Sequence, residues 1–128
     1  MNVELARFNM IEQQIRPWEV LDDRVLTLLS QVRREDFVPE SARTLAFADV
    51  NIPLALGETM MAPKVEARMV QALAVTENDS VLEIGTGSGY VTVLLAKLAR
   101  EVYSIDQHAE FTLSAREKLA QANLRNVT

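Results

Sequence analysis

Apolar residues recur at three- and four-residue spacing through most of the first 75 positions, a pattern that predicts amphipathic helices. Helices are expected over residues 2–16, over a segment capped by Asp22, over 41–48, and from Ala62 onward. The side chains expected on the buried helix faces are Phe8, Ile11 and Ile15, then Val25, Leu28, Leu29 and Val32, and then Val65, Met69 and Leu73.

Proline and glycine mark the breaks between these helices. Pro17 is expected to end the first helix, and Trp18 to fill the following turn against the core. Residues 49–63 contain two of the four prolines and the first of the four glycines, and no regular period runs through them. This segment is therefore expected to be an ordered loop, and a loop of that length is often functional.

After residue 76 the pattern changes to short apolar runs alternating with helical segments. The expected elements are strand 81–84, helix 90–99, strand 102–105, helix 109–122 and the start of a third strand at 126–128. Val93, Leu94, Leu98, Leu113 and Leu119 are expected to face inward, with Glu117 and Lys118 outward. Strands alternating with helices form a parallel sheet with right-handed crossovers, so the sequence predicts an α/β fold.

Net charge and residue composition exclude several classes of protein function. A net charge of −5 argues against an obligate nucleic-acid or anionic-membrane partner, and the pair Arg33 and Arg34 is expected to be a solvated surface. The chain has no cysteine, and its lone His108 excludes a histidine-cluster metal site, so no metal is expected. No apolar run approaches the ~20 residues needed to cross a bilayer. We therefore expect a cytoplasmic protein.

A glycine-rich loop, Gly85-Thr86-Gly87-Ser88-Gly89, directly follows the strand at 81–84. Glycine permits unusual backbone angles and close approach of a ligand to the backbone. Loops at the carboxyl ends of parallel strands are where open α/β sheets bind ligands. A dinucleotide fingerprint would need a third glycine at position 90, which is Tyr90. A tight turn without a ligand is the alternative interpretation.

Two carboxylates favour a ligand over a plain turn. Glu83 stands two positions before the first glycine, where it would repel a pyrophosphate and attract the ammonium and sulfonium groups of S-adenosylmethionine. Asp106 follows the next strand, where an acidic side chain can accept both ribose hydroxyls of an adenosine. The residues expected to bind this cofactor are Glu83, Gly85, Thr86, Gly87, Ser88, Gly89 and Asp106.

The segment Val81-Leu82-Glu83-Ile84-Gly85-Thr86-Gly87-Ser88-Gly89-Tyr90 resembles the first S-adenosylmethionine motif of the protein-L-isoaspartate O-methyltransferase family. The resemblance extends upstream through residues 10–16, 23–26, 33–39 and 46–49, and downstream through 102–106. It implies a class I methyltransferase with a Rossmann-like sheet, in which 1–75 form a helical and substrate-loop region and 76–128 the first half of the cofactor domain. It also implies methyl transfer to the carboxylate of L-isoaspartyl residues in damaged proteins, a repair reaction.

The substrate loop departs from that family. The family pattern is G-Q-T-I-S-[QA]-P, whereas residues 57–63 of this chain read G-E-T-M-M-A-P. Met61 replaces the serine that would hydrogen-bond the reacting carboxylate, and Glu58 replaces a neutral glutamine. Thr59 keeps a hydroxyl, which either contacts substrate or only stabilises the loop.

These departures leave three functions to compare. The first is an isoaspartyl methyltransferase, and the second is a methyltransferase with a different acceptor. The third is a non-catalytic S-adenosylmethionine-binding or protein-interaction domain on the same scaffold. The family's sheet has seven strands and this sequence reaches the third, so an incomplete cofactor domain is expected. Such a chain is expected to be inactive, to bind cofactor poorly, and to self-associate through the exposed first strand at 81–84.

Overall fold

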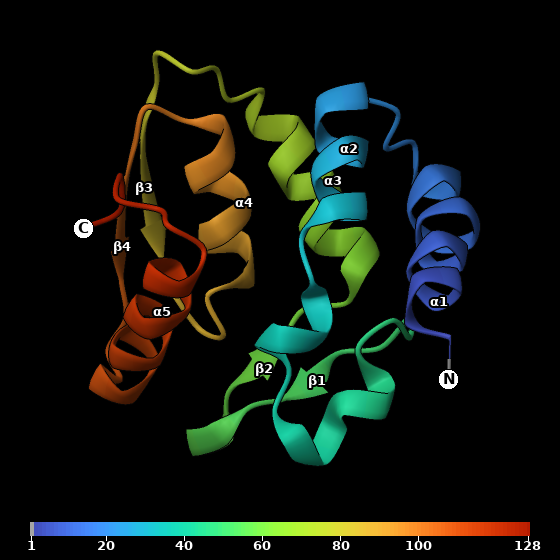
Figure 1. Cartoon of the computed structure of the whole chain (residues 1–128), viewed down its shortest axis with the longest axis horizontal. Helices are drawn as coiled ribbons and strands as arrows, with labels where there is room; N and C mark the ends of the chain where they lie inside the picture. The colour runs from blue at the N-terminus through green and yellow to red at the C-terminus, as the bar shows by residue number, and fades with distance from the viewer. Residues whose placement is uncertain (1) are drawn as a thin grey trace. The chain divides into compact units, whose positions relative to one another are not determined.

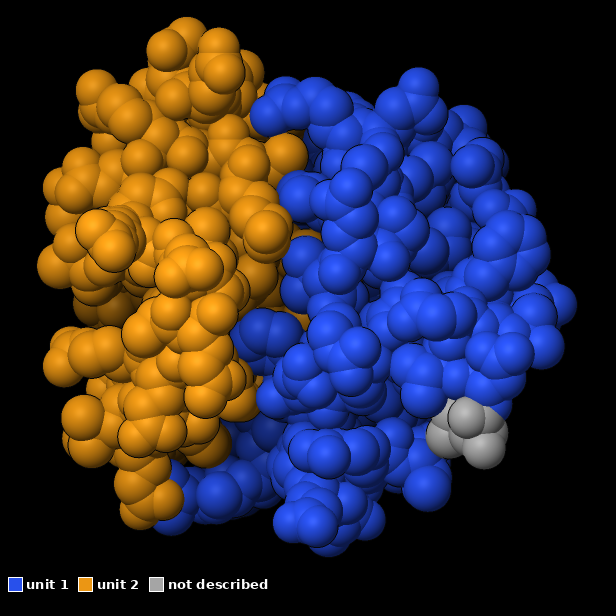
Figure 2. Space-filling view, in the orientation of Figure 1, with its two compact units in different colours: residues 1–73 blue, residues 74–128 orange. Residues whose placement is uncertain are grey.

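A computed structural model describes residues 2–128, which form two compact units, one ending at Leu73 and the other spanning Ala74–Thr128 (Figure 2). The α-helices and strands, shown in Figure 1, are α1 (Val3–Met10), α2 (Asp23–Gln31), β1 (Ile52–Pro53), β2 (Thr59–Met60), α3 (Pro63–Leu73), β3 (Ser80–Ile84), α4 (Tyr90–Leu98), β4 (Glu101–Ile105) and α5 (Ala109–Gln121). No helix within residues 2–128 is long and apolar enough to span a bilayer.

The first helix continues from α1 into a π-helical turn that begins at Ile11 and ends at Ile15. Both isoleucines are buried, as predicted. Phe8 is exposed, contrary to prediction, because the buried face of this helix follows Arg7, Met10, Ile11 and Ile15 at three- and four-residue spacing and Phe8 lies outside it. Arg7 faces the core instead, where its two Nη atoms bind the Glu35 carboxylate at 2.9 and 2.8 Å.

The first helix ends in a 3₁₀ turn that contains Pro17, and not before this proline as expected. Proline is tolerated in the first turn of such a helix, and the chain leaves it at Glu19, whose φ is 63°. Trp18 is exposed at this turn and does not fill the core, contrary to prediction. The Lys64 ammonium lies 4.6 Å from the centre of its ring, a cation–π contact that an exposed tryptophan can make.

Asp22 caps α2, as predicted. Its Oδ1 accepts hydrogen bonds from the backbone N–H groups of Arg24 and Val25 at 2.9 and 3.2 Å. The side chains buried on and just after this helix are Val25, Leu26, Leu29 and Val32, whereas Leu28, which was expected among them, is half-buried.

Arg34 is fully buried and is not the solvated surface residue expected from its sequence. It forms an ion pair with Glu66 at 2.9 Å and donates to the carbonyls of Ala46 and Met61, the latter at 3.0 Å. Because Glu66 turns inward to meet Arg34, the buried face of α3 differs from the predicted one. Its buried side chains include Glu66, Ala67 and Val70, whereas Met69 and Leu73 are exposed.

Residues 49–63 contain a short hairpin, which the sequence pattern did not predict. β1 pairs with β2 in antiparallel register, with Ile52 opposite Met60 and Pro53 opposite Thr59. Two residues per strand are too few to give a readable alternation of apolar and polar positions. The third helix expected at 41–48 is a 3₁₀ helix over Glu40–Leu45.

The second unit has the predicted β-α-β-α order. β3 pairs with β4 in parallel, and Val127 bridges to Val102 on the other side of β4, at the start of the expected third strand. Within residues 2–128, β3 is thus an edge strand. The buried side chains of α4 include Val93, Leu94 and Leu98, as predicted, and those of α5 are Phe111, Ala115 and Leu119. Leu113 is exposed and Lys118 half-buried, which corrects both expectations.

Candidate functional site

The loop between β3 and α4 has a backbone that requires its glycines. The φ angles of Gly85, Gly87 and Gly89 are 98°, 54° and 88°, all in the left-handed region that side chains with a Cβ rarely adopt. The N–H groups of Gly85 and Thr86 donate to the carbonyl of Ile105 at 2.7 and 3.1 Å. The end of β4 therefore fixes where the loop begins.

The space in front of the loop is open at its first glycine. A Cβ built on Gly85 would meet no heavy atom within 4 Å, its chain neighbours aside. A ligand can therefore approach the backbone closely here, as the glycine at this position led us to expect.

Asp106 lies against the glycine loop, as its position after β4 predicts. Ile84 and Ile105 are paired in the sheet, so the residues that follow them emerge side by side. The Asp106 carboxylate accepts a hydrogen bond from Gly87 N–H at 3.0 Å and another from His108 N–H at 2.8 Å. Each oxygen of an ionised carboxylate can accept more than one hydrogen bond, so Asp106 retains capacity for a ligand hydroxyl.

The Glu83 carboxylate is hydrogen-bonded by one hydroxyl group of α4 and one of β4. Its Oε1 accepts hydrogen bonds from Thr92 Oγ1 and, at 2.6 Å, from Ser104 Oγ. Ser104 Oγ also lies 2.6 Å from Thr86 Oγ1. Burial raises the pKa of Glu83 above its usual value, and the two hydroxyl donors oppose that rise. The Asp106 charge adds to the rise.

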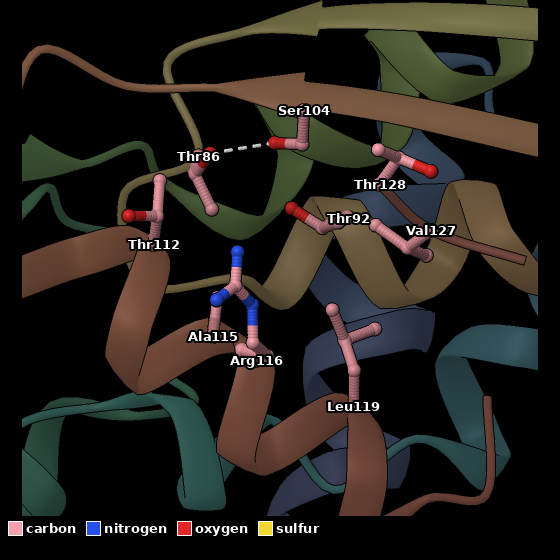
Figure 3. Close-up of a pocket in the computed structure, with 9 residues that line it drawn as sticks. All are labelled: Thr86, Thr92, Ser104, Thr112, Ala115, Arg116, Leu119, Val127 and Thr128. Atoms are coloured by element: carbon pink, nitrogen blue, oxygen red, sulfur yellow. Dashed lines mark hydrogen bonds between the residues drawn. The ribbon is translucent and has the colours of Figure 1, made fainter. Parts of the chain in front are cut away.

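Below the loop, on the side of the sheet that faces α4 and α5, is a pocket of about 260 Å³. Figure 3 shows the Thr86–Ser104 contact at its edge and the Arg116 side chain projecting into it from α5. The pocket is lined by Thr86, Thr92, Ser104, Thr112, Ala115, Arg116, Leu119, Val127 and Thr128. Of the residues expected to bind a cofactor, Thr86 alone is among them, so this pocket and the surface above the glycines are different places.

Ser88 at the end of the loop is held by its neighbours. Its carbonyl accepts a hydrogen bond from Lys118 Nζ at 2.9 Å, and its hydroxyl accepts one from Tyr90 N–H at 3.3 Å. Lys118 therefore connects α5 to the loop.

The structure adds Thr92 and Ser104 to the site, which the sequence analysis missed. Thr92 is a fully buried polar residue on an apolar helix, and Ser104 interrupts an apolar strand. A hydroxyl at an inward position of each element was the available signal.

In the first unit, the hydroxyl of Thr59 belongs to an exposed residue of β2. Met61 directly follows this strand with its side chain 37% exposed, while its carbonyl accepts from Arg34. The Met61 side chain is therefore partly exposed to solvent and offers no hydroxyl.

A glycine loop on a parallel βαβ unit, with an acidic residue after the second strand, defines a Rossmann-like α/β fold. Solved structures share this fold. A Plasmodium falciparum protein-L-isoaspartate O-methyltransferase in complex with S-adenosyl-L-homocysteine matches with a TM-score of 0.76 at 20% identity, covering 99% of this chain and 61% of that chain. A second protein-L-isoaspartate O-methyltransferase gives 0.75 at 19% identity, covering 97% of this chain and 40% of that chain.

The chain belongs to the protein-L-isoaspartate(D-aspartate) O-methyltransferase family, whose sequence profile matches residues 6–128. The family resemblance predicted from the sequence is thus confirmed. A protein-L-isoaspartate O-methyltransferase of Koribacter versatilis is 39% identical over 124 residues, which are 97% of this chain and 56% of that protein. The Myxococcus xanthus protein of the same name is 46% identical over 109 residues, 85% of this chain and 51% of that protein. The chain thus spans about half the length of these curated relatives.

Proposed function

We propose that the whole protein is an S-adenosylmethionine-dependent methyltransferase that acts on L-isoaspartyl carboxylates of damaged proteins. The observation that carries this proposal is the position of Asp106, hydrogen-bonded to Gly87 in a glycine loop whose front is open. The names of the relatives support the reaction, and the solved complex with S-adenosyl-L-homocysteine supports the cofactor.

The residues present fit this cofactor. Asp106 would accept the ribose hydroxyls with the lone pairs that Gly87 and His108 leave available. Glu83 would stabilise the positively charged methionine end, because its Oε1 is held by two hydroxyls and its charge lies close to the loop. Gly85 would let the ligand contact the backbone. Thr86, Ser88 and Gly89 would contribute through the shape of the loop.

S-adenosylmethionine would supply a methyl group on a positively charged sulfur that is its own leaving group. When bound, it would pass this methyl group to a carboxylate oxygen of the acceptor, the electron pair of the carbon–sulfur bond would leave with the sulfur, and the product would be a methyl ester. The residues of this chain would therefore contribute by positioning the methyl donor and by electrostatic stabilisation of the reacting groups. Thr59 would orient the acceptor through its hydroxyl, since Met61 cannot.

The direct test is methyl transfer from radiolabelled S-adenosylmethionine to two peptides of one sequence, one with isoaspartate and one with aspartate. The proposal expects label in the isoaspartyl peptide alone. Equal labelling of both peptides would indicate a different acceptor. No labelling, together with cofactor binding in calorimetry, would favour the alternative function.

That alternative is a non-catalytic domain that binds S-adenosylmethionine or another protein. The specific observation in its favour is the exposed Met61 side chain, which places no hydroxyl at the family's serine position. Glu58 stands where the family has a glutamine. This replacement also favours the non-catalytic alternative, because a carboxylate repels an anionic acceptor.

Three further assignments are proposals. We propose that residues 1–75 serve the substrate and 76–128 the cofactor, that the protein works in the cytoplasm, and that the 128-residue chain self-associates through β3. Self-association is supported by the free edge of this strand and by its exposed apolar face. That face comprises Leu82, Ile84, Tyr103 and Ile105, which are 62%, 78%, 43% and 53% exposed.

A further inference from the structure

An exposed leucine occupies an unfavourable backbone position in the hairpin between β1 and β2. Leu56 has φ 61° and ψ 26°, and the next residue, Gly57, has φ 76°. The N–H of Glu58 donates to the carbonyl of Ala55 at 3.2 Å, which closes the turn. These features match a type I′ turn with Leu56 at its first central position.

Leucine is a poor residue for that position. Type I′ turns favour Asn, Asp or Gly there, because the left-handed conformation brings a Cβ too close to the backbone. Burial does not compensate, since Leu56 is 51% exposed. The hairpin is held by other residues: Ile52 and Met60 are buried, and Leu54 N–H donates to the carbonyl of Glu58 at 2.8 Å. Nothing in the fold therefore requires a leucine at the tip.

We propose that Leu56 is a specificity-determining residue that contacts an apolar side chain of the peptide substrate near its isoaspartyl residue. This inference rests on the proposed function. Leu56 precedes Thr59 by three positions, so their Cα atoms are at most about 11 Å apart, the span of about three extended residues. The contacted side chain therefore lies within about three positions of the methyl acceptor. An aliphatic residue is the chemical match for an exposed leucine.

Three variants of the whole protein separate the side chain from the backbone strain. Leu56→Asn removes the apolar group and suits the turn. Leu56→Ala removes most of the apolar group but keeps a Cβ in the left-handed region. Leu56→Met keeps an apolar side chain of similar size and keeps the strain. We expect the melting temperature to rise for the Asn variant and not for the Met variant.

The substrates are isoaspartyl peptides in pairs that differ only by Leu or Ser at one position, one to three residues from the isoaspartate on either side. For at least one pair we expect wild type to have a KM about tenfold lower for the Leu peptide, with similar kcat. The Asn and Ala variants lose this difference, and the Met variant keeps it. The Kd of fluorescein-labelled peptides, measured by anisotropy, follows the same order.

Equal KM and Kd for every Leu and Ser pair in wild type would overturn the inference, as would a preference that survives in Leu56→Asn. A failure of the proposed function looks different. No isoaspartyl peptide would then be methylated, yet a preference for the Leu peptide in Kd, abolished by Leu56→Asn, would still support the contact. Absence of that preference would reject it.

Discussion

Asp106 is the residue on which the proposed cofactor site depends most. Asp106→Ala removes the carboxylate expected at the ribose, and a hydrogen bond that involves a charged group is worth about 1.5–3 kcal/mol. We expect calorimetry on the whole protein to show at least a tenfold rise in the Kd for S-adenosylmethionine. Glu117→Ala, at an exposed position of α5, is the matched control and leaves the Kd unchanged. An unchanged Kd for Asp106→Ala would remove this residue from the site.

Glu83 gives a prediction for the pH dependence of stability. Burial raises its pKa in the folded chain above the value of 4.5, which the unfolded chain retains. Between these two values the folded state binds more protons than the unfolded state, so the free energy of unfolding falls as pH rises. Other carboxyl groups also titrate in this range, and the lowered pKa of Glu35 acts in the opposite direction. Urea denaturation at a series of pH values should therefore show wild type losing stability relative to Glu83→Gln as the pH rises above 4.5. Parallel curves above pH 4.5 would show that Glu83 is not desolvated.

Met61 allows a gain-of-function test. If it occupies the position of the family's serine, wild-type turnover of an isoaspartyl peptide is weak. Met61→Ser supplies a hydroxyl and should raise kcat/KM by about tenfold, the scale of one hydrogen bond to a charged group. Met61→Ala controls for the smaller side chain and should give no gain. A vigorous wild-type enzyme would show that this hydroxyl is dispensable.

At the residue scale, the sequence predicted backbone chemistry better than side-chain partners. Gly85, Gly87 and Gly89 all have the positive φ angles expected, and Asp106 meets the loop. The hydroxyl network around Glu83 was missed, because a hydroxyl on an apolar element does not reveal which neighbour it will meet. The roles of these residues toward a cofactor stay predictions.

At the scale of elements, the buried Arg34–Glu66 pair joins the 3₁₀ helix Arg34–Phe37 to α3. Removing one partner leaves a buried charge, which typically costs about 3–5 kcal/mol. We expect Glu66→Leu to lower the free energy of unfolding by that amount in urea titrations. The double variant that adds Arg34→Met should recover part of the loss.

The control for this pair is the exposed pair of Arg16 and Glu12, whose side chains are 45% and 39% exposed. Glu12→Ala should cost less than about 1 kcal/mol, because solvent screens such pairs. If Glu66→Leu lowered the free energy of unfolding by no more than Glu12→Ala does, the buried pair would contribute little to stability.

The positions of most elements of the second unit were predicted well, and the hairpin of the first unit was not. β3 and β4 are short apolar runs next to turns, α4 buries Val93, Leu94 and Leu98 at helical spacing, and Asp22 is a typical cap of α2, so each matches the sequence pattern. The β1–β2 hairpin has too few residues to show a pattern. The inner faces of α1 and α3 were misassigned because Arg7 and Glu66 are charged, and their burial depends on distant partners, Glu35 and Arg34.

At the scale of the whole molecule, the parallel sheet of the second unit is covered on one face. α4 contacts the face that carries Glu83 and Ser104. On the opposite face Leu82 is paired with Tyr103, and Ile84 with Ile105, and all four side chains are exposed. Purely parallel sheets are normally buried on both faces, so this surface favours association.

We expect the 128-residue chain to dimerise at micromolar concentration, with the β3 edge and the apolar face of one copy meeting those of another. Ile84→Lys places a charge on that face, at its most exposed residue, and should shift the mass measured by light scattering toward the monomer. Leu113→Lys, at an exposed position of α5 outside the face, should leave the dimer intact. Circular dichroism checks that both variants fold. A wild-type chain that stays monomeric at 100-fold higher concentration than the assay would reject the association. A dimer that persists in Ile84→Lys would show that the dimer interface lies on another surface.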